Sequence, residues 1–245
     1  GTAQTTNGIP TGHAYTTSTT AGVQIGTSLL NTDANVIINS STTGGGGPIF
    51  ISGQQSGTAI GSWGVIIYSG STINSGTSTV TIDGIANSNT GNAVELDPNG
   101  TTQLLKITSA APSGTAISIT GAESGTPGAN GGGRGIGAWG ANLTISATGG
   151  GNISLTGSQT SANTSNPGGI ALSGADITAT TGNVSINGNS GIYLANATYN
   201  FGATSAGSAT GNVTLTGDVI YSNQTINVKT TGAVVFESSA AAFTS

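Results

Sequence analysis

Charge is the first thing that this sequence lacks. Its 245 residues include 3 Lys or Arg and 8 Asp or Glu, so charged residues make up 4% of the chain, against roughly 25% in an ordinary soluble domain. Nucleic-acid binding needs clustered Lys and Arg, and the whole supply here is Lys106, Arg134 and Lys229. With a net charge of −5, we expect no nucleic-acid partner and no attraction to anionic lipid.

Cysteine and methionine are absent as well. Their absence excludes disulfides, thiolate metal sites and catalytic thiols. No apolar run approaches the roughly 20 residues that a membrane-spanning helix needs, so we expect no membrane insertion of this chain. The first residues, Gly1 to Gln4, resemble neither a signal peptide nor a basic anchor, and we interpret the chain as a mature or excised form. We expect it to be extracellular.

Strong helix formers are also scarce, and no stretch has the i, i+3, i+4 apolar spacing of an amphipathic helix. We therefore expect no long helix. Disorder is the alternative, because Gly, Ser, Thr and Asn dominate the chain. Against disorder, the chain has 6 Pro and little charge, and its 34% hydrophobic residues include many short β-branched pairs. Such pairs indicate strands that bury one face.

What the sequence does contain is a repeated unit of roughly 20 to 27 residues. From Gly169 the chain reads GIALSGADITATTGNVSING, and from Gly191 it reads GIYLANATYNFGATSAGSATGNVTLTG. Both units open with G-I-x-L and close with G-N-V-x-[IL]-x-G. The same outline begins at Gly135 and Gly64 and, more loosely, at Gly22. Internal repeats of this length are typical of solenoids.

Each unit holds three short alternating segments, which in the unit at Gly169 are Ile170 with Leu172, Ile177 alone, and Val184 with Ile186. The alternation predicts half-buried strands of about three to five residues. Three such strands, separated by Gly, Asn, Asp and Ser turns, match one coil of an all-β parallel β-helix, or β-solenoid. An antiparallel sandwich is the competing interpretation, but it would want longer strands and hairpin turns.

The number of coils and the domain limits follow from this plan. With GNAVELDPNG from Gly91 and GTAISITG from Gly114 filling the gaps, we expect nine or ten coils and a body roughly 45 Å long at about 4.8 Å per coil. The predicted domains are an N-terminal extension or first partial coil over 1–21, a β-solenoid over 22–238 and a C-terminal tail over 239–245.

Insertions and turn asparagines complete the predicted coil. The segments Thr42 to Gly47, Gly121 to Gly133 and Ser158 to Pro167 are expected as loops that leave the coil on one edge. An asparagine follows a glycine in several units, at Asn92, Asn152, Asn183 and Asn212. These asparagines could stack as an amide ladder, but they are equally explained as turn formers.

The repeat resembles that of a known family. The units G-[IV]-x-[LI] … A-x-[IL] … G-N-[VI]-x-[IL]-x-G, with tails like Lys229 to Phe236, resemble the repeat region of filamentous-haemagglutinin-type large exoproteins, and the likeness covers most of the chain from Gly22 to Phe236. It implies a right-handed parallel β-helix, export across a Gram-negative envelope through an outer-membrane partner, and a role in adhesion, aggregation or biofilm. The family's secretion domain carries N-P-N-G near its start, whereas Asp97 to Gly100 reads D-P-N-G mid-chain and is interpreted as a turn.

A polysaccharide-cleaving β-helix would need convergent carboxylates, or a base with Ca²⁺ or Arg support. Only Glu95 and Asp97 stand at i, i+2 on one strand face, with no His or Arg near them in sequence. We interpret this pair as a solvated turn. The single histidine, His13, lies among Thr and Ser near the N-terminus, and we interpret it as exposed and inert rather than part of a Ser-His-Asp set.

Two other features have both a functional and a structural interpretation. The glycine runs Gly44 to Gly47 and Gly131 to Gly133, the latter before Arg134, lack the Lys-Ser/Thr of a phosphate loop and are interpreted as loops. Trp63 and Trp139 each precede Gly in matching places near a unit start, and coil-corner packing is preferred over carbohydrate stacking. We therefore assign no catalytic, cofactor-binding or metal-binding residue, and we expect no cofactor.

These features favour a structural and adhesive element of a bacterial surface or matrix fibre over an enzyme. A first alternative is a filament subunit whose copies stack end to end, because the sequence shows no cap for the terminal strand edges. A second is a protein that binds ice or crystalline polysaccharide, for which Thr144, Thr156, Thr178 and Thr214 look too scattered. A polysaccharide lyase or hydrolase is last. The expected partners are other copies, end to end or lateral, and cell-surface or matrix glycans.

Overall fold

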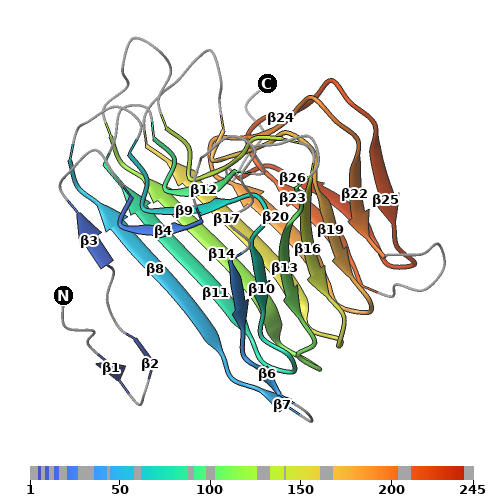
Figure 1. Ribbon diagram of the computed structural model, residues 1–245. Coiled ribbons are helices and arrows are strands. Elements are labelled where there is room, and N and C mark those ends of the chain that lie inside the picture. The colour runs from blue at the N-terminus through green and yellow to red at the C-terminus, as the bar shows by residue number, and fades with distance from the viewer. Residues whose placement is uncertain are drawn as a thin grey trace.

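The protein is described by a computed structural model that places residues 5–6, 9–10, 14–16, 21–26, 36–42, 45–57, 62–87, 91–97, 103–125, 133–140, 142–160, 168–203 and 211–239. Over these ranges the chain forms strands and turns without any helix (Figure 1). No helix within them could therefore cross a membrane.

Three sheets carry almost all of the strands. Sheet 1 contains β3 (Ala14–Thr16), β8 (Ile49–Gln55), β11 (Val80–Ala86), β14 (Thr115–Glu123), β17 (Asn152–Gln159), β20 (Val184–Gly188), β23 (Val213–Thr216) and β26 (Val234–Glu237). Sheet 2 contains β4 (Val23–Ile25), β9 (Val65–Tyr68), β12 (Val94–Asp97), β15 (Ile136–Ala138), β18 (Ile170–Leu172), β21 (Ile192–Leu194) and β24 (Ile220–Ser222). Sheet 3 contains β5 (Ile37–Asn39), β10 (Thr72–Asn74), β13 (Leu105–Ser109), β16 (Leu143–Ala147), β19 (Asp176–Ala179), β22 (Tyr199–Gly202) and β25 (Ile226–Lys229).

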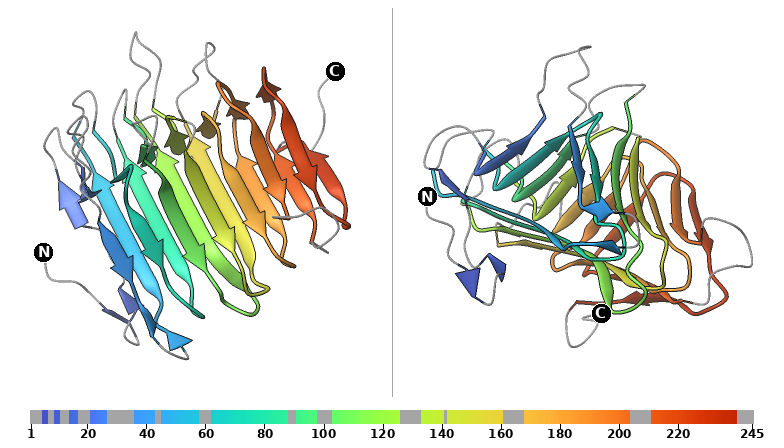
Figure 2. Two further views of the ribbon diagram at one scale, coloured as in Figure 1. Left: turned by 45° about the vertical axis from the view of Figure 1, so that its right-hand side comes forward. Right: turned by 60° about the horizontal axis from the view of Figure 1, so that its bottom comes forward.

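Each coil crosses the sheets in one order, so that chain order is also the order along the axis (Figure 2). In the unit that begins at Gly169, β18 lies in sheet 2, β19 in sheet 3 and β20 in sheet 1, and each pairs in parallel with its counterpart in the preceding coil. The three predicted segments of the repeat are thus its three strands. The parallel β-helix is confirmed, and the antiparallel sandwich is excluded.

The predicted number of coils is wrong. Sheets 2 and 3 have seven strands each and sheet 1 has eight, which corresponds to about seven coils and a body roughly 34 Å long. The segments from Gly91 and Gly114 had been counted as further coils, but they supply β12 and β14, which are two sides of one coil. Some coils are also longer than the predicted unit, such as the one from Val80 to its register partner Ile117, whereas the coil from Ile170 to Ile192 keeps the predicted length.

Strand lengths and loop positions differ from the prediction as well. Four strands of sheet 1 have seven to nine residues, namely β8, β11, β14 and β17. The loops predicted to start at Gly121 and Ser158 therefore begin inside strands, near the ends of β14 and β17. The predicted loop from Thr42 lies at a different corner, between sheets 3 and 1. There β6 (Ser41–Thr42) and β7 (Gly45–Gly46) form an antiparallel pair. A second such pair joins β1 (Thr5–Thr6) to β2 (Ile9–Pro10).

The core is a stack of aliphatic side chains that point inward from all three sheets. In sheet 3 one column contains Ile73, Ile107, Ile145 and Ile177, each in register with the next and each with no exposed surface. Every inward side chain of a middle coil therefore packs between equivalent side chains above and below it, which is how a solenoid buries a core that no single coil could bury.

A column of glycines sets how closely two sheets approach. Gly53, Gly84, Gly121, Gly157 and Gly188 occupy one register position of sheet 1. A Cβ atom built on Gly121 would lie 1.9 Å from the carbonyl oxygen of Gly135, at the start of sheet 2. Because that neighbour is backbone, no side chain fits at this corner without moving a coil.

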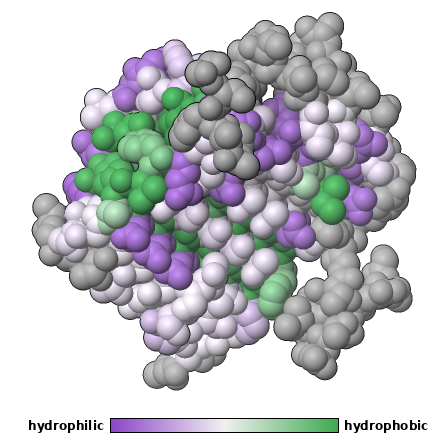
Figure 3. All heavy atoms as spheres, turned by 180° about the vertical axis from the view of Figure 1, so that it is seen from behind, coloured by the Kyte–Doolittle hydropathy of each residue, from purple (hydrophilic) through white to green (hydrophobic). Residues whose placement is uncertain are grey.

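The last described coil leaves apolar side chains exposed. Val234 and Phe236 of β26 are 45% and 60% exposed, whereas Val213 and Leu215, their partners in β23, have no exposed surface. Val219 and Tyr221 nearby are also largely exposed. In the view from behind, hydrophobic residues gather on this end of the molecule (Figure 3). The last described coil therefore presents core side chains that no further coil covers.

Candidate functional site

Of the carboxylate pair singled out in the sequence, Glu95 does not lie in a solvated turn. Glu95 lies in β12 on the outer face of sheet 2 but is 3% exposed, and it accepts a hydrogen bond from the side-chain amide of Asn92. Asp97 is the last residue of the same strand. The described residues contain no group of three or more His, Cys, Asp and Glu side chains that could hold a metal ion.

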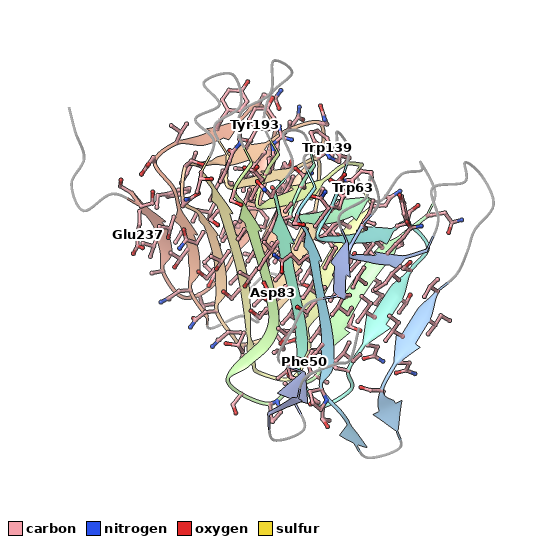
Figure 4. The ribbon with its side chains drawn as sticks, turned by 90° about the vertical axis from the view of Figure 1, so that its left-hand side faces the viewer. Phe50, Trp63, Asp83, Trp139, Tyr193 and Glu237 are labelled. Atoms are coloured by element: carbon pink, nitrogen blue, oxygen red, sulfur yellow. The ribbon has the colours of Figure 1, made fainter. Side chains whose placement is uncertain are left out.

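The next coil brings a cation to Glu95, which sequence proximity could not show. Arg134 is 8% exposed, and the Cζ atom of its guanidinium lies 4.8 Å from the centroid of the Trp139 ring. Burial lowers the pKa of Arg134, whereas the charge of Glu95 raises it. Tyr193 lies in the same region of the molecule (Figure 4). Arg134 is therefore part of an electrostatic cluster, while Gly131 and Gly132 of the glycine run before it lie outside the described residues.

Asn92 connects Glu95 to the backbone of the next coil through two hydrogen bonds. Its Oδ1 accepts the backbone N–H of Arg134 at 2.9 Å, while its Nδ2 donates to Glu95. A Cβ atom on Gly137, which pairs with Glu95 in β15, would lie 2.0 Å from Nδ2 of Asn92. Gly137 thus provides the space for the amide. These hydrogen bonds join two coils and give the buried Asn92 and Glu95 a structural role.

The other sequence candidates fall at unrelated places. Trp63 precedes β9, whereas Trp139 follows β15, so the two tryptophans do not occupy matching positions and that prediction is wrong. The side chain of Trp139 is 43% exposed and carries the contact with Arg134. Of the first glycine run, Gly45 and Gly46 form β7. His13 lies outside the described residues.

Three of the four turn asparagines do form a ladder, but through the backbone. Oδ1 of Asn152 accepts the N–H of Asn183, Oδ1 of Asn183 accepts that of Asn212, and Oδ1 of Asn212 accepts that of Ala233, each at 2.8 Å. Asn92 makes the same contact to Arg134 at another corner. Each asparagine thus satisfies a backbone N–H of the following coil, which a stack of side-chain amides alone would not do.

The outer face of sheet 1 is a regular array of small polar side chains. One outward column contains Thr81, Ser118, Ser154, Ser185 and Thr214, and the column two residues further along each strand contains Asp83, Thr120, Thr156, Asn187 and Thr216. All are partly exposed apart from Thr120, which is exposed. Neighbours are spaced about 4.8 Å along the axis and about 6.6 Å along the strand.

The four threonines singled out in the sequence belong to two different sheets. Thr156 and Thr214 lie in adjacent columns of sheet 1, whereas Thr144 and Thr178 lie in adjacent columns of sheet 3. They look scattered in the sequence because strands of sheets 1 and 3 alternate along the chain. Phe50, Asp83 and Glu237, which lie on β8, β11 and β26 of sheet 1, are labelled in Figure 4.

The outer face of sheet 3 carries a groove of about 450 Å³, which we call the sheet 3 groove. Its lining includes Lys106, Thr144, Asp176, Thr178, Asn200 and Lys229. Nδ2 of Asn200 donates to Oδ1 of Asp176 at 2.6 Å, and Oγ1 of Thr178 donates to Oγ of Ser146 at 3.2 Å. Sequence reasoning missed this site, because its members come from five strands and share only their register.

Comparison with known proteins does not extend this description. No protein-family model matches the chain, and neither the curated proteins nor the solved structures contain a significant match. The chemistry of the surfaces described above therefore carries the functional argument.

Proposed function

We propose that this chain is a structural and adhesive segment of an extracellular fibre at a bacterial surface or in its matrix, and that it is not an enzyme. The repeat's resemblance to filamentous-haemagglutinin-type exoproteins implies that location and role. The low charge and the absence of cysteine are compatible with it.

One observation carries the structural part of the proposal. Successive coils have the same three-strand plan, and the last described coil leaves Val234 and Phe236 exposed where their counterparts in β23 are fully buried. A coil of this kind is complete only when another coil covers it. The plan therefore supports a longer solenoid built by extension of the same ladder.

The outer surfaces support the adhesive part. Sheet 1 offers a flat array of hydroxyl, amide and carboxylate groups across five consecutive strands, and sheet 3 offers a polar groove. Such surfaces bind through many weak contacts, and the overall affinity rises when these contacts are repeated along a fibre. A fibre that displays them needs no catalytic residue.

Adhesion is tested with the whole chain coupled to beads in several copies. Beads that carry the chain should aggregate bacterial cells or bind a glycan-coated surface, and beads that carry an unrelated β-rich protein of similar charge should not. The double variant Ser154→Lys and Thr156→Lys changes only the outer face of sheet 1, and it therefore tests whether that face carries the adhesion. If the wild-type beads and the control beads behaved alike on every surface, the adhesive proposal would fail.

A second candidate, a self-assembling filament subunit, is favoured by the same open coil. Strands β24, β25 and β26 each have one neighbour and a free edge in the described chain, and such edges pair readily with another chain. Electron microscopy of the purified protein separates the two cases. Fibres many times longer than the roughly 34 Å body would establish stacking of copies, whereas isolated rods of that length would exclude it under those conditions.

A further inference from the structure

The two lysines of this charge-poor chain occupy the same groove. Lys106 lies on β13 and Lys229 on β25, at opposite ends of a run of five neighbouring strands in sheet 3. Four strand spacings separate them, which is about 19 Å along the solenoid axis. The third cation of the chain, Arg134, is buried on sheet 2. Both accessible cations therefore line one groove.

Neither ammonium group is engaged by another residue of the described ranges. Among the described residues, no hydrogen bond or ion pair involves the side chain of Lys106 or Lys229. Lys106 is exposed and Lys229 is half-buried. Asp176, the one carboxylate of the groove, lies two strands from each lysine and is held by Asn200 instead. Two ammonium groups are thus left to pair with anionic groups of a ligand.

The floor between the lysines is polar and suited to hydroxyl groups. Ser146 and Thr178 face the groove although they are only 8% and 6% exposed. Nδ2 of Asn227 donates to Oδ1 of Asn200 at 3.1 Å, which continues the row that begins at Asp176. Gly202 separates Thr178 from Lys229 in their column without adding a side chain. The groove therefore offers hydroxyl, amide and carboxylate partners along its length.

These groups define the chemistry of the occupant. A chain of hydroxyl-bearing units can donate to Asp176 and exchange hydrogen bonds with the threonines, while anionic groups near its two ends can reach the lysines. A densely charged polymer is disfavoured, because it would meet the carboxylate of Asp176 at the centre and a net charge of −5. A nucleic acid has one phosphate charge per about 1.7 Å of duplex, which two lysines cannot match.

We propose that the sheet 3 groove binds an acidic polysaccharide with widely spaced carboxylates, laid along the solenoid axis between Lys106 and Lys229. This inference rests on the proposed adhesive function and names the ligand class of one of its surfaces. Repetition of the sugar units along the axis matches the repetition of coils beneath them.

Binding is measured by titration calorimetry with oligosaccharides of equal length that span both lysines. Hyaluronan oligosaccharide carries one carboxylate on every second sugar and is the expected ligand. Chitin oligosaccharide is neutral and should bind about tenfold more weakly. Added salt should weaken hyaluronan binding, because exposed ion pairs are screened. Equal binding of the neutral chain, or tighter binding of a densely sulfated heparin oligosaccharide, would overturn the proposal.

Variants locate the binding in the groove. The double variant Lys106→Gln and Lys229→Gln should lower hyaluronan affinity roughly fivefold or more, since each exposed ion pair contributes modestly. The matched control Ser118→Asp and Asn187→Asp changes the net charge by the same amount on sheet 1 and should leave the affinity unchanged. Asp176→Asn should raise it, because the repulsion of the ligand is removed while an acceptor for Asn200 remains. An equal loss of hyaluronan affinity in the groove variant and in the control variant would show that binding follows net charge alone, and it would contradict the proposed site.

The groove assignment and the adhesive proposal can fail independently of each other. If the double lysine variant on beads still adheres as the wild type does, and hyaluronan does not bind, the groove assignment fails while the adhesive proposal stands. If hyaluronan binds as expected but no bead adheres to any surface, the adhesive proposal fails and the groove remains a glycan site.

Discussion

The middle coils and the last coil of this solenoid are built from the same kinds of residues but differ in burial. Leu155 in β17 and Ile186 in β20 have no exposed surface, whereas Phe236 at the same register position of β26 is 60% exposed. The inward positions are apolar in each strand, although Val235 of β26 replaces the outward polar residue that Thr214 supplies in β23. Burial in this fold therefore depends on the neighbouring coil, because each coil contributes only one layer of the core.

The largest expected difference concerns truncation of an inward side chain. Leu155→Ala should lower the free energy of unfolding by about 2–5 kcal/mol, because a cavity opens between two coils that cannot close around it. Phe236→Ala should lower it by less than about 1 kcal/mol, since that side chain is already largely in water. Denaturant unfolding followed by circular dichroism measures both. Similar losses at the two positions would mean that the last coil is covered in solution.

The glycine column gives a second contrast between the middle and the end. Gly121→Ala should destabilise the fold by about 1–3 kcal/mol, because the new Cβ would lie 1.9 Å from the carbonyl oxygen of Gly135. Gly217 continues the column near the C-terminal end, where the nearest atom, the carbonyl oxygen of Gly188, is 3.0 Å from the Cβ position. Gly217→Ala should therefore cost a few tenths of a kcal/mol. Thermal unfolding of the two variants side by side tests the order.

The asparagine ladder should contribute less than the core. Asn183→Ala leaves the backbone N–H of Asn212 without its acceptor and should lower stability by about 1 kcal/mol. Asn183→Asp keeps an acceptor at the same place and should restore most of the loss. Asn227→Ala is the matched control, because the exposed amide of Asn227 donates only to the side chain of Asn200. If Asn227→Ala cost as much as Asn183→Ala, the ladder would have no special role.

The smallest effect is confined to alkaline pH and involves Tyr199 in β22. Burial raises the pKa of its phenol to about 12, and the N–H of Gly174, which donates to the hydroxyl at 2.9 Å, acts in the opposite direction. Because the folded pKa lies above the unfolded value of about 10, the stability that this group contributes is complete below pH 10 and is lost as pH rises through 12. Ultraviolet titration should show one tyrosine that ionises late, and Tyr199→Phe should remove that step. An unchanged titration curve in Tyr199→Phe would contradict the assignment.

The repeat itself was predictable from the sequence. The G-I-x-L and G-N-V-x-[IL]-x-G segments carry period-2 alternation between turn residues, and these local properties fixed three parallel strands per coil. The number of coils was not predictable, because Gly91 and Gly114 begin segments that look like separate units. Only the register, in which β12 follows β9 and β14 follows β11, assigns them to one coil.

The candidate sites were less accessible to sequence reasoning. Lys106, Asp176 and Lys229 lie far apart in the chain, and no motif connects them. Glu95 and Arg134 are likewise separated by most of a coil, so the pairing of their charges became visible only in the structure. In both cases the residues come from different coils, so their distance in the sequence depends on the lengths of the intervening loops.

What the sequence by itself determined is the character of one coil: three short strands, glycine and asparagine turns, an aliphatic interior and an uncharged exterior. These properties depend on neighbours along the chain. What the tertiary structure decided is everything that depends on stacking: the number of coils, the polar columns of sheets 1 and 3, the shared groove of the two lysines, and the open end at β26. The physical reason is that strand pairing in a parallel β-helix places residues of successive coils about 4.8 Å apart, however many residues of loop separate them.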